Sequence, residues 1–122
     1  MTQITPPLYP LRFEPIYKSK VWGGRNLQRM GRTLPGGQDN LIGESWELAD
    51  IGQSSISGGG GGAERSVVAN GPLKGQTLHD LISHYGEQFM GRLPLTPTGE
   101  FPLLVKFLDA NENLSVQVHP SP

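Results

Sequence analysis

Cysteine and long hydrophobic runs are both missing from this sequence of 122 residues. Without cysteine the chain forms no disulfide bridge and offers no thiolate metal ligand, and a reducing compartment suits it. No apolar segment approaches the length of a membrane-spanning helix. The N-terminal stretch "MTQITPPLYPLRF" also lacks the basic and apolar regions of a secretory signal. We therefore expect a cytoplasmic protein without a membrane partner.

Charge is scarce and almost balanced, because ten basic and eleven acidic side chains give a formal net charge of −1. With no basic excess and no local Lys/Arg cluster, we expect no nucleic-acid partner. Hydrophobic residues are also few, at 35%, whereas glycine (17) and proline (11) are abundant. This composition favours short strands and turns over long helices, and the length suits one domain covering residues 1–122.

Extended segments are expected in the first half of the chain. Residues 8–17 mix aromatic residues with proline and predict an extended arm or an edge strand. The pair Gly23 and Gly24 is expected to serve a turn. The stretch "GESWELAD" (43–50) predicts a strand. We interpret Trp22 and Trp46 as core aromatics rather than platforms for substrate.

A glycine-rich segment, "GQSSISGGGGGAERS" (52–66), interrupts this pattern. Consecutive glycines give the backbone great conformational freedom and have no side chains that could pack, so we expect a flexible surface loop. A phosphate-cradling loop is the alternative, but the G-x-x-x-x-G-K-[ST] pattern and a following helix are both missing. The next stretch, "SVVANG" (66–71), predicts a short strand closed by an Asn-Gly turn.

One helix is predicted to begin after Thr77, which can act as its N-cap with Asp80 three residues later. Gly86 is expected to end it. Its buried face follows the i, i+3, i+4, i+7 pattern through Leu78, Leu81, Ile82 and Tyr85.

The last twenty residues predict a β-hairpin, with strands at 101–110 and 114–120 around the polar turn 111–113. Alternate residues of a strand share a face. The side chains at 115, 117 and 119 in the stretch "LSVQVHP" therefore point the same way, with about 7 Å between the Cα atoms of successive members. An amide oxygen and an imidazole on one strand can hold two corners of a zinc site, which needs about three protein ligands. The alternative is a polar face that is simply solvated or hydrogen-bonded.

Four stretches resemble the type I phosphomannose isomerases, which are zinc enzymes of the cupin fold. They are "EPIYKSKVWGG" (14–24), "IGESWELAD" (42–50), "SVVANGPLKGQTLHDLI" (66–82) and "FPLLVKFLDANENLSVQVHP" (101–120). Together they cover most of the chain and keep the order they have in that family. The resemblance implies a mainly β fold, an incomplete cupin-type jelly roll with one inserted helical segment.

The resemblance also implies an activity, the zinc-dependent interconversion of mannose 6-phosphate and fructose 6-phosphate. It places zinc ligands at Gln117 and His119, and substrate-binding residues at Ser115 and Lys106. The family's remaining ligands, a Glu and a second His, lie downstream of the position matching Pro122, so no catalytic residue is assigned. We therefore expect the N-terminal part of an isomerase, truncated and doubtful in activity on its own.

Other residues are poor replacements for those ligands. His79 and His84 are five residues apart, about 140° around a helix, and do not converge. Glu44 and Glu47 point opposite ways on a strand, so we expect a solvated face or a local ion pair. The alternative to an enzyme is a non-catalytic fragment of the same fold that binds a sugar phosphate or self-associates through open sheet edges.

Overall fold

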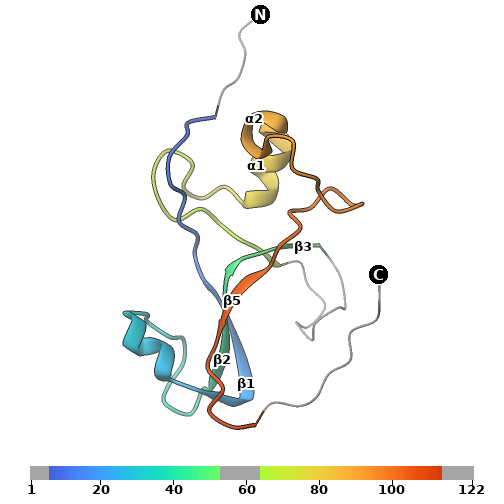
Figure 1. Cartoon of the computed structure of the whole chain (residues 1–122). Coiled ribbons are helices and arrows are strands. Elements are labelled where there is room, and N and C mark those ends of the chain that lie inside the picture. The colour runs from blue at the N-terminus through green and yellow to red at the C-terminus, as the bar shows by residue number, and fades with distance from the viewer. Residues whose placement is uncertain (1–5, 53–63, 114–122) are drawn as a thin grey trace, which may run out of the picture. The chain divides into compact units, whose positions relative to one another are not determined.

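The computed structural model of the chain describes residues 6–52 and 64–113 (Figure 1). Strands provide most of the regular structure there, so the described part is mainly β, as predicted. Its elements are β1 (Ile16–Gly24), the 3₁₀ helix η1 (Asn26–Met30), β2 (Ile42–Leu48), β3 (Asp50–Ile51), β4 (Glu64–Arg65), α1 (Leu78–Tyr85), α2 (Glu87–Met90) and β5 (Val105–Leu108). No helix among the described residues is long and apolar enough to cross a membrane.

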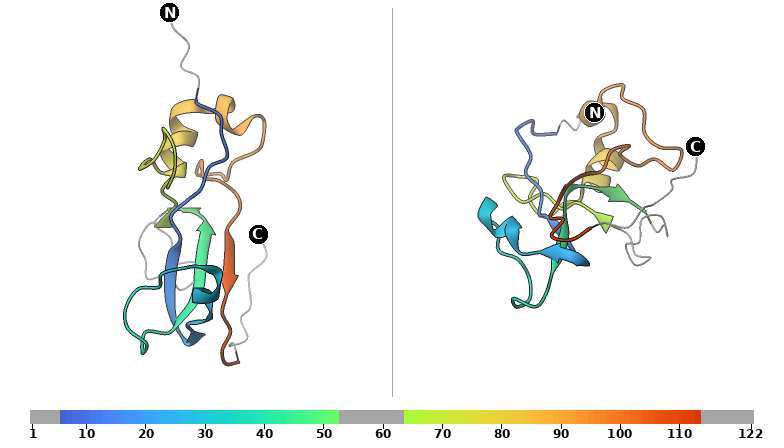
Figure 2. Two further views of the ribbon diagram at one scale, coloured as in Figure 1. Left: turned by 90° about the vertical axis from the view of Figure 1, so that its left-hand side faces the viewer. Right: turned by 60° about the horizontal axis from the view of Figure 1, so that its bottom comes forward.

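The described residues form two sheets. The larger one has the strand order β1-β2-β5, and the left-hand view of Figure 2 shows these strands side by side. The smaller one pairs β3 with β4 in antiparallel fashion, with Asp50 opposite Arg65 and Ile51 opposite Glu64. The predicted glycine-rich loop is therefore shorter at its C-terminal end, because Glu64 and Arg65 are held in a strand. The rest of that loop, residues 53–63, lies outside the described residues.

The glycine pair in β1 does not form the predicted turn. Gly23 and Gly24 are buried and are the last two residues of the strand. A Cβ atom at Gly23 would lie 2.5 Å from the backbone nitrogen of Gly43 and 2.5 Å from the carbonyl carbon of Ile42. The prediction was wrong because the glycine is needed for a close approach of two strands, a role that the local sequence does not distinguish from a turn.

The chain divides into two compact units, and the first comprises residues 1–16 and 46–106. Its core is a cluster of Val68, Leu73 and Leu81, against which further aromatic and aliphatic side chains pack: Tyr9, Leu11, Phe13, Tyr85 and Phe89. The first three of these come from the extended arm that leads into β1. The predicted strand at 66–71 is reduced to single bridges, which join Val67 to Thr77 and Val68 to Phe13.

Helix α1 forms where the sequence predicts it. The backbone N–H of Asp80 donates to the Thr77 hydroxyl at 3.0 Å, which satisfies one of the free donors of the first turn. Leu78, Leu81 and Ile82 are buried on one face. The helix ends at Gly86, whose φ of 55° suits glycine and few other residues.

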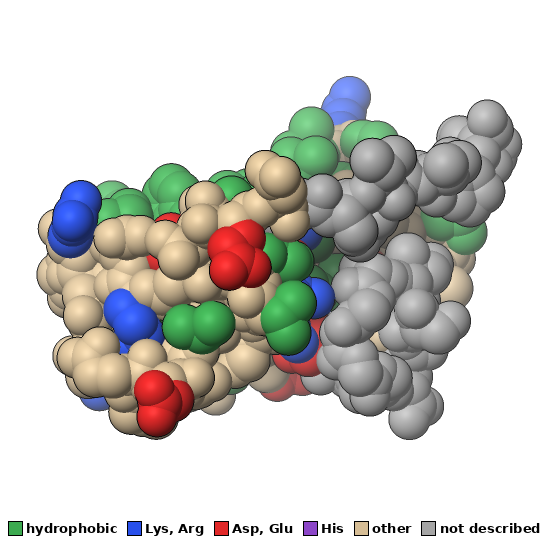
Figure 3. Space-filling view, turned by 90° about the horizontal axis from the view of Figure 1, so that it is seen from below, with side chains coloured by type: hydrophobic (Ala, Val, Ile, Leu, Met, Phe, Trp, Pro, Cys, Tyr) green, Lys and Arg blue, Asp and Glu red, His purple; other side chains and the backbone are tan. Residues whose placement is uncertain are grey.

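The second unit comprises residues 17–45 and 107–122. Its core cluster contains Leu27, Leu34 and Ile42, with Tyr17 packed against it. Arg25 stabilises the irregular loop at 31–40 by donating to the carbonyl oxygens of Pro35 and Asn40, at 2.9 and 2.8 Å. On the face in Figure 3, the basic side chains of the described residues are scattered among acidic, hydrophobic and other groups and do not gather into a basic patch.

Candidate functional site

Three of the four predicted site residues, Ser115, Gln117 and His119, lie outside the described residues, as does the second strand of the predicted hairpin. The fourth, Lys106, lies in β5 and is exposed. Among the four predicted site residues, only Lys106 therefore has surroundings that the structure describes.

The Lys106 ammonium lies over a buried aromatic ring. Its Nζ is 5.9 Å from the centroid of the Trp46 ring. Trp46 belongs to β2 and is only 1% exposed, which confirms it as a core aromatic, whereas Trp22 in β1 is only partly buried. A cation above an indole face is attracted by the ring quadrupole, by roughly 0.5–1 kcal/mol at an exposed site. The positive charge is thus held beside β2, on a residue that is exposed.

Strand β5 is more exposed than its sequence indicates. Val105, Phe107 and Leu108 are 46%, 43% and 51% exposed, although all three are apolar. Its following residue, Asp109, is buried instead. The Asp109 carboxylate accepts from the backbone N–H of Asn26 at 2.8 Å and from the Asn26 side chain at 3.1 Å.

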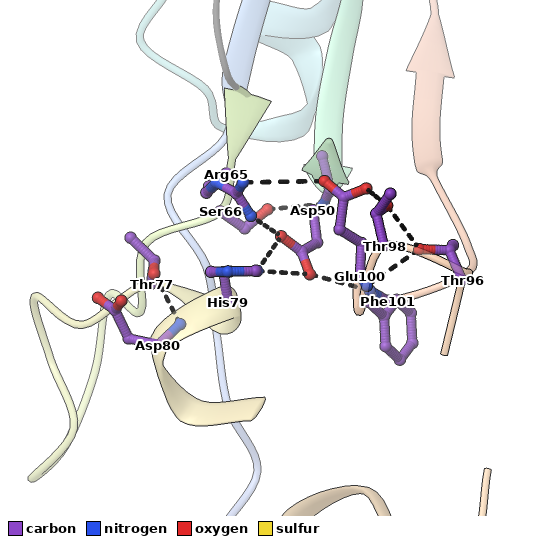
Figure 4. Close-up of polar contacts among 11 residues, drawn as sticks. Asp50, Arg65, Ser66, Thr77, His79, Asp80, Thr96, Thr98, Glu100 and Phe101 are labelled. Atoms are coloured by element: carbon purple, nitrogen blue, oxygen red, sulfur yellow. Dashed lines mark hydrogen bonds and ion pairs between the residues drawn. The ribbon is translucent and has the colours of Figure 1, made fainter. Parts of the chain in front are cut away.

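A buried carboxylate, that of Asp50, lies at the centre of a polar cluster (Figure 4). Its side chain is wholly buried, and Arg65 Nη1 donates to it at 2.6 Å. The backbone N–H of Phe101 donates to it at 2.9 Å, and His79 Nδ1 lies 3.2 Å from its nearer oxygen. A buried charge is stable only when it is paired and hydrogen-bonded, and Asp50 meets both conditions.

Glu100 extends this cluster. The Thr98 hydroxyl donates to the Glu100 carboxylate at 2.6 Å, and Arg65 Nη2 lies 3.8 Å from its other oxygen. The Thr98 hydrogen bond is the largest influence that lowers the pKa of Glu100 below its ordinary value, followed by the Gly52 backbone and the charges of Arg65 and His79, while burial opposes them. Glu100 is therefore held as a carboxylate at neutral pH.

The cluster is no metal centre. Among residues 6–52 and 64–113, no group of three or more His, Asp or Glu side chains is placed to hold a metal ion. His79 contacts Asp50, and the His84 ring stands edge-on to Tyr85 with centroids 4.6 Å apart. Glu44 is only 8% exposed, so the solvated face considered for it is wrong.

The model of the family "Phosphomannose isomerase type I, catalytic domain" matches residues 10–122. The chain belongs to this family. Mannose-6-phosphate isomerase ManA of Bacillus subtilis is 41% identical over 112 residues, which cover 92% of this chain and 30% of that protein. The mannose-6-phosphate isomerase of Streptococcus mutans is 38% identical over 112 residues, with 91% and 30% covered.

A solved structure supports the same assignment. The crystal structure of the mannose 6-phosphate isomerase from Bacillus subtilis matches with a TM-score of 0.62 and 34% identity, over 83% of this chain and 27% of that one. This agrees with the predicted cupin-type fold for the part that is covered. The chain spans about 30% of the length of the curated relatives it matches.

Sequence reasoning missed the cluster around Asp50 altogether. In the sequence, Asp50 was only the last residue of a predicted strand, and His79 was considered only as a poor replacement for a metal ligand. A single sequence carries no signal that pairs residues so far apart.

Proposed function

We propose that this chain carries part of an aldose–ketose isomerase that interconverts mannose 6-phosphate and fructose 6-phosphate. The observation that carries the proposal is the family match over residues 10–122. Relatives named mannose-6-phosphate isomerases, about 40% identical to the chain, support it. Because the chain spans only about 30% of their length, the activity of a complete enzyme is inferred from the family.

The proposal gives the candidate residues separate roles. Gln117 and His119 would hold a zinc ion, which when bound would stabilise negative charge on the substrate oxygens. Ser115 and Lys106 would bind the substrate, with the lysine ammonium neutralising either the phosphate or an enediolate. The exposed position of Lys106 over the Trp46 ring supports this role.

The reaction moves a proton between C1 and C2 of the sugar through an enediol, so it also needs a general base. We assign no residue of the chain to that step. The two carboxylates described above are unsuited to it, since Asp50 is wholly buried and occupied by donors, and Glu100 is bonded to Thr98.

A second candidate function is a non-catalytic module that binds a sugar phosphate and self-associates. The observation in its favour is the apolar exposure of β5, which has only β2 as its neighbour in the described sheet. An edge strand of this kind can pair with another chain.

Two measurements on the purified chain separate these functions. An isomerase is expected to bind one zinc ion per chain and to turn over mannose 6-phosphate in a coupled assay. The His119→Ala variant should lose both, whereas His84→Ala, which changes a histidine of α1, should lose neither. Sugar-phosphate binding with neither zinc nor turnover, together with dimers in sedimentation, would instead establish the second function.

A further inference from the structure

Residues 46–50 hold residues 101–106 at two points. At one end, the Asp50 carboxylate accepts from the backbone N–H of Phe101 at 2.9 Å. At the other end, the Trp46 ring lies 5.9 Å beneath the Lys106 ammonium. Asp50 and Trp46 belong to one short stretch of chain, so the two contacts together determine where residues 101–106 lie along it.

The contact at Phe101 is rigid because the carboxylate that makes it is itself held from two other elements. Arg65 in β4 donates to one oxygen at 2.6 Å, and His79 in α1 lies 3.2 Å from that same oxygen. The other oxygen accepts from the Phe101 N–H at 2.9 Å and lies 3.4 Å from the same His79 nitrogen. Figure 4 shows these groups converging on Asp50. A wholly buried carboxylate with this many donors has little freedom to turn.

On the N-terminal side of Phe101, the segment that Asp50 holds forms a hydrogen-bonded turn of its own. Thr96 N–H donates to the Glu100 carbonyl at 2.9 Å, and Gly99 N–H donates to the Thr96 carbonyl at 2.9 Å, which closes a turn. On the C-terminal side, Pro102 restricts the backbone by fixing its own φ. A shift at Phe101 is therefore passed on toward Lys106 instead of being absorbed by a loose loop.

We propose that Asp50 is a positioning residue, which sets the register of residues 101–106 against β2 and so places the Lys106 ammonium for an anionic substrate group. Only the assignment of a substrate to Lys106 rests on the function proposed above. Asp50 touches neither substrate nor metal in this scheme, and it acts through the backbone of Phe101.

The test is the Asp50→Asn variant of the chain. An amide has the size of the carboxylate, but it offers one acceptor oxygen and one NH₂ donor, so it cannot serve donors on both sides. Hydrogen exchange followed by mass spectrometry should then speed up several-fold over residues 101–106 and stay unchanged in β1 (Ile16–Gly24). In the coupled assay, KM for mannose 6-phosphate should rise several-fold while kcat changes less.

Two further variants complete the experiment. Asp39→Asn makes the same charge change at an exposed loop residue and should leave exchange and KM unaltered. Arg65→Lys keeps the charge but loses the guanidinium fork, and it should act in the same direction as Asp50→Asn but less strongly. If Asp50→Asn does not fold, the hydrogen exchange and KM of Arg65→Lys test the positioning role instead.

Each contrary outcome has its own meaning. Unchanged exchange over residues 101–106, or an equal rise in β1, overturns the positioning role. Faster exchange with an unaltered KM overturns the link to Lys106. If even the unmodified chain shows no turnover, the proposed isomerase function fails for this chain, and the exchange result still decides whether Asp50 sets the register.

Discussion

Helix α1 and the cluster around Asp50 belong to the same unit, but they are stabilised over very different distances along the chain. The helix start depends on Thr77 and Asp80, which are three residues apart. Asp50 is separated from Arg65 by 15 positions, from His79 by 29 and from Phe101 by 51. The helix can therefore begin to form alone, whereas the cluster exists only when four segments have already come together.

The two features also differ in what is lost if one member is removed. A missing cap leaves one backbone donor that water can reach. A missing Asp50 leaves the Arg65 guanidinium and the Phe101 N–H facing a site from which water is excluded. Unsatisfied buried groups cost far more than exposed ones, so the cluster should be the more sensitive of the two.

The strongest test of this comparison is Asp50→Ala. Breaking a buried pair by removing one partner costs about 3–5 kcal/mol, and we expect the lower end, about 3 kcal/mol, because Arg65 is 27% exposed and can be partly solvated. The free energy of unfolding from a denaturant titration measures the loss. Asp39→Ala, at an exposed loop position, is the control and should stay near zero; a loss at Asp50 no larger than this would contradict the comparison.

The matching local change is Thr77→Ala. It removes the hydroxyl that accepts from Asp80 N–H, and the loss of such a cap costs about 1 kcal/mol. The same titration measures it, with Thr33→Ala in an exposed loop as its control. A cap variant that destabilises the chain more than Asp50→Ala would reverse the order argued here.

The same distinction explains which features were predictable. The helix was predictable because its cap, its apolar face and its terminating Gly86 all lie within ten residues. Trp46 and the extended arm followed from residue type and spacing. The Gly23 prediction failed because its physical reason, the backbone of Gly43, is in another strand.

For the candidate site, Lys106 was assigned through a family resemblance, and the structure adds its contact with Trp46. The buried Asp50 and Asp109 were not assigned, since the donors that make their burial tolerable come from distant segments. Periodicity identifies a face of a strand, but it does not tell which carboxylate will meet an arginine from elsewhere in the chain.

Lowering the pH is expected to change the stability of the fold by a smaller amount. The pKa of Glu100 is lowered, first by the Thr98 hydrogen bond, so the folded state favours the carboxylate. Its contribution to stability is present above the ordinary pKa of 4.5 and is lost as the pH falls through the lower, folded-state value. In Thr98→Val, melting temperatures measured from pH 7 to pH 3 should show less of this acid loss. A profile parallel to that of the parent chain would show that Thr98 has no such influence.

The smallest change in the free energy of unfolding is expected from altering the length of the segment between β3 and β4, the two strands of the smaller sheet. The pairing of Ile51 with Glu64 brings the ends of the intervening segment together. The adjacent ion pair between Asp50 and Arg65 stabilises the pairing of β3 with β4. Closing a loop costs entropy that grows only slowly with length, so deleting the five glycines at 58–62 should raise the free energy of unfolding by less than about 1 kcal/mol. Inserting five more glycines there should lower it by a similarly small amount. A deletion that instead destabilises the chain as much as Asp50→Ala would mean that the hairpin depends on the segment between its strands, and that the cluster does not hold β3 and β4 by itself.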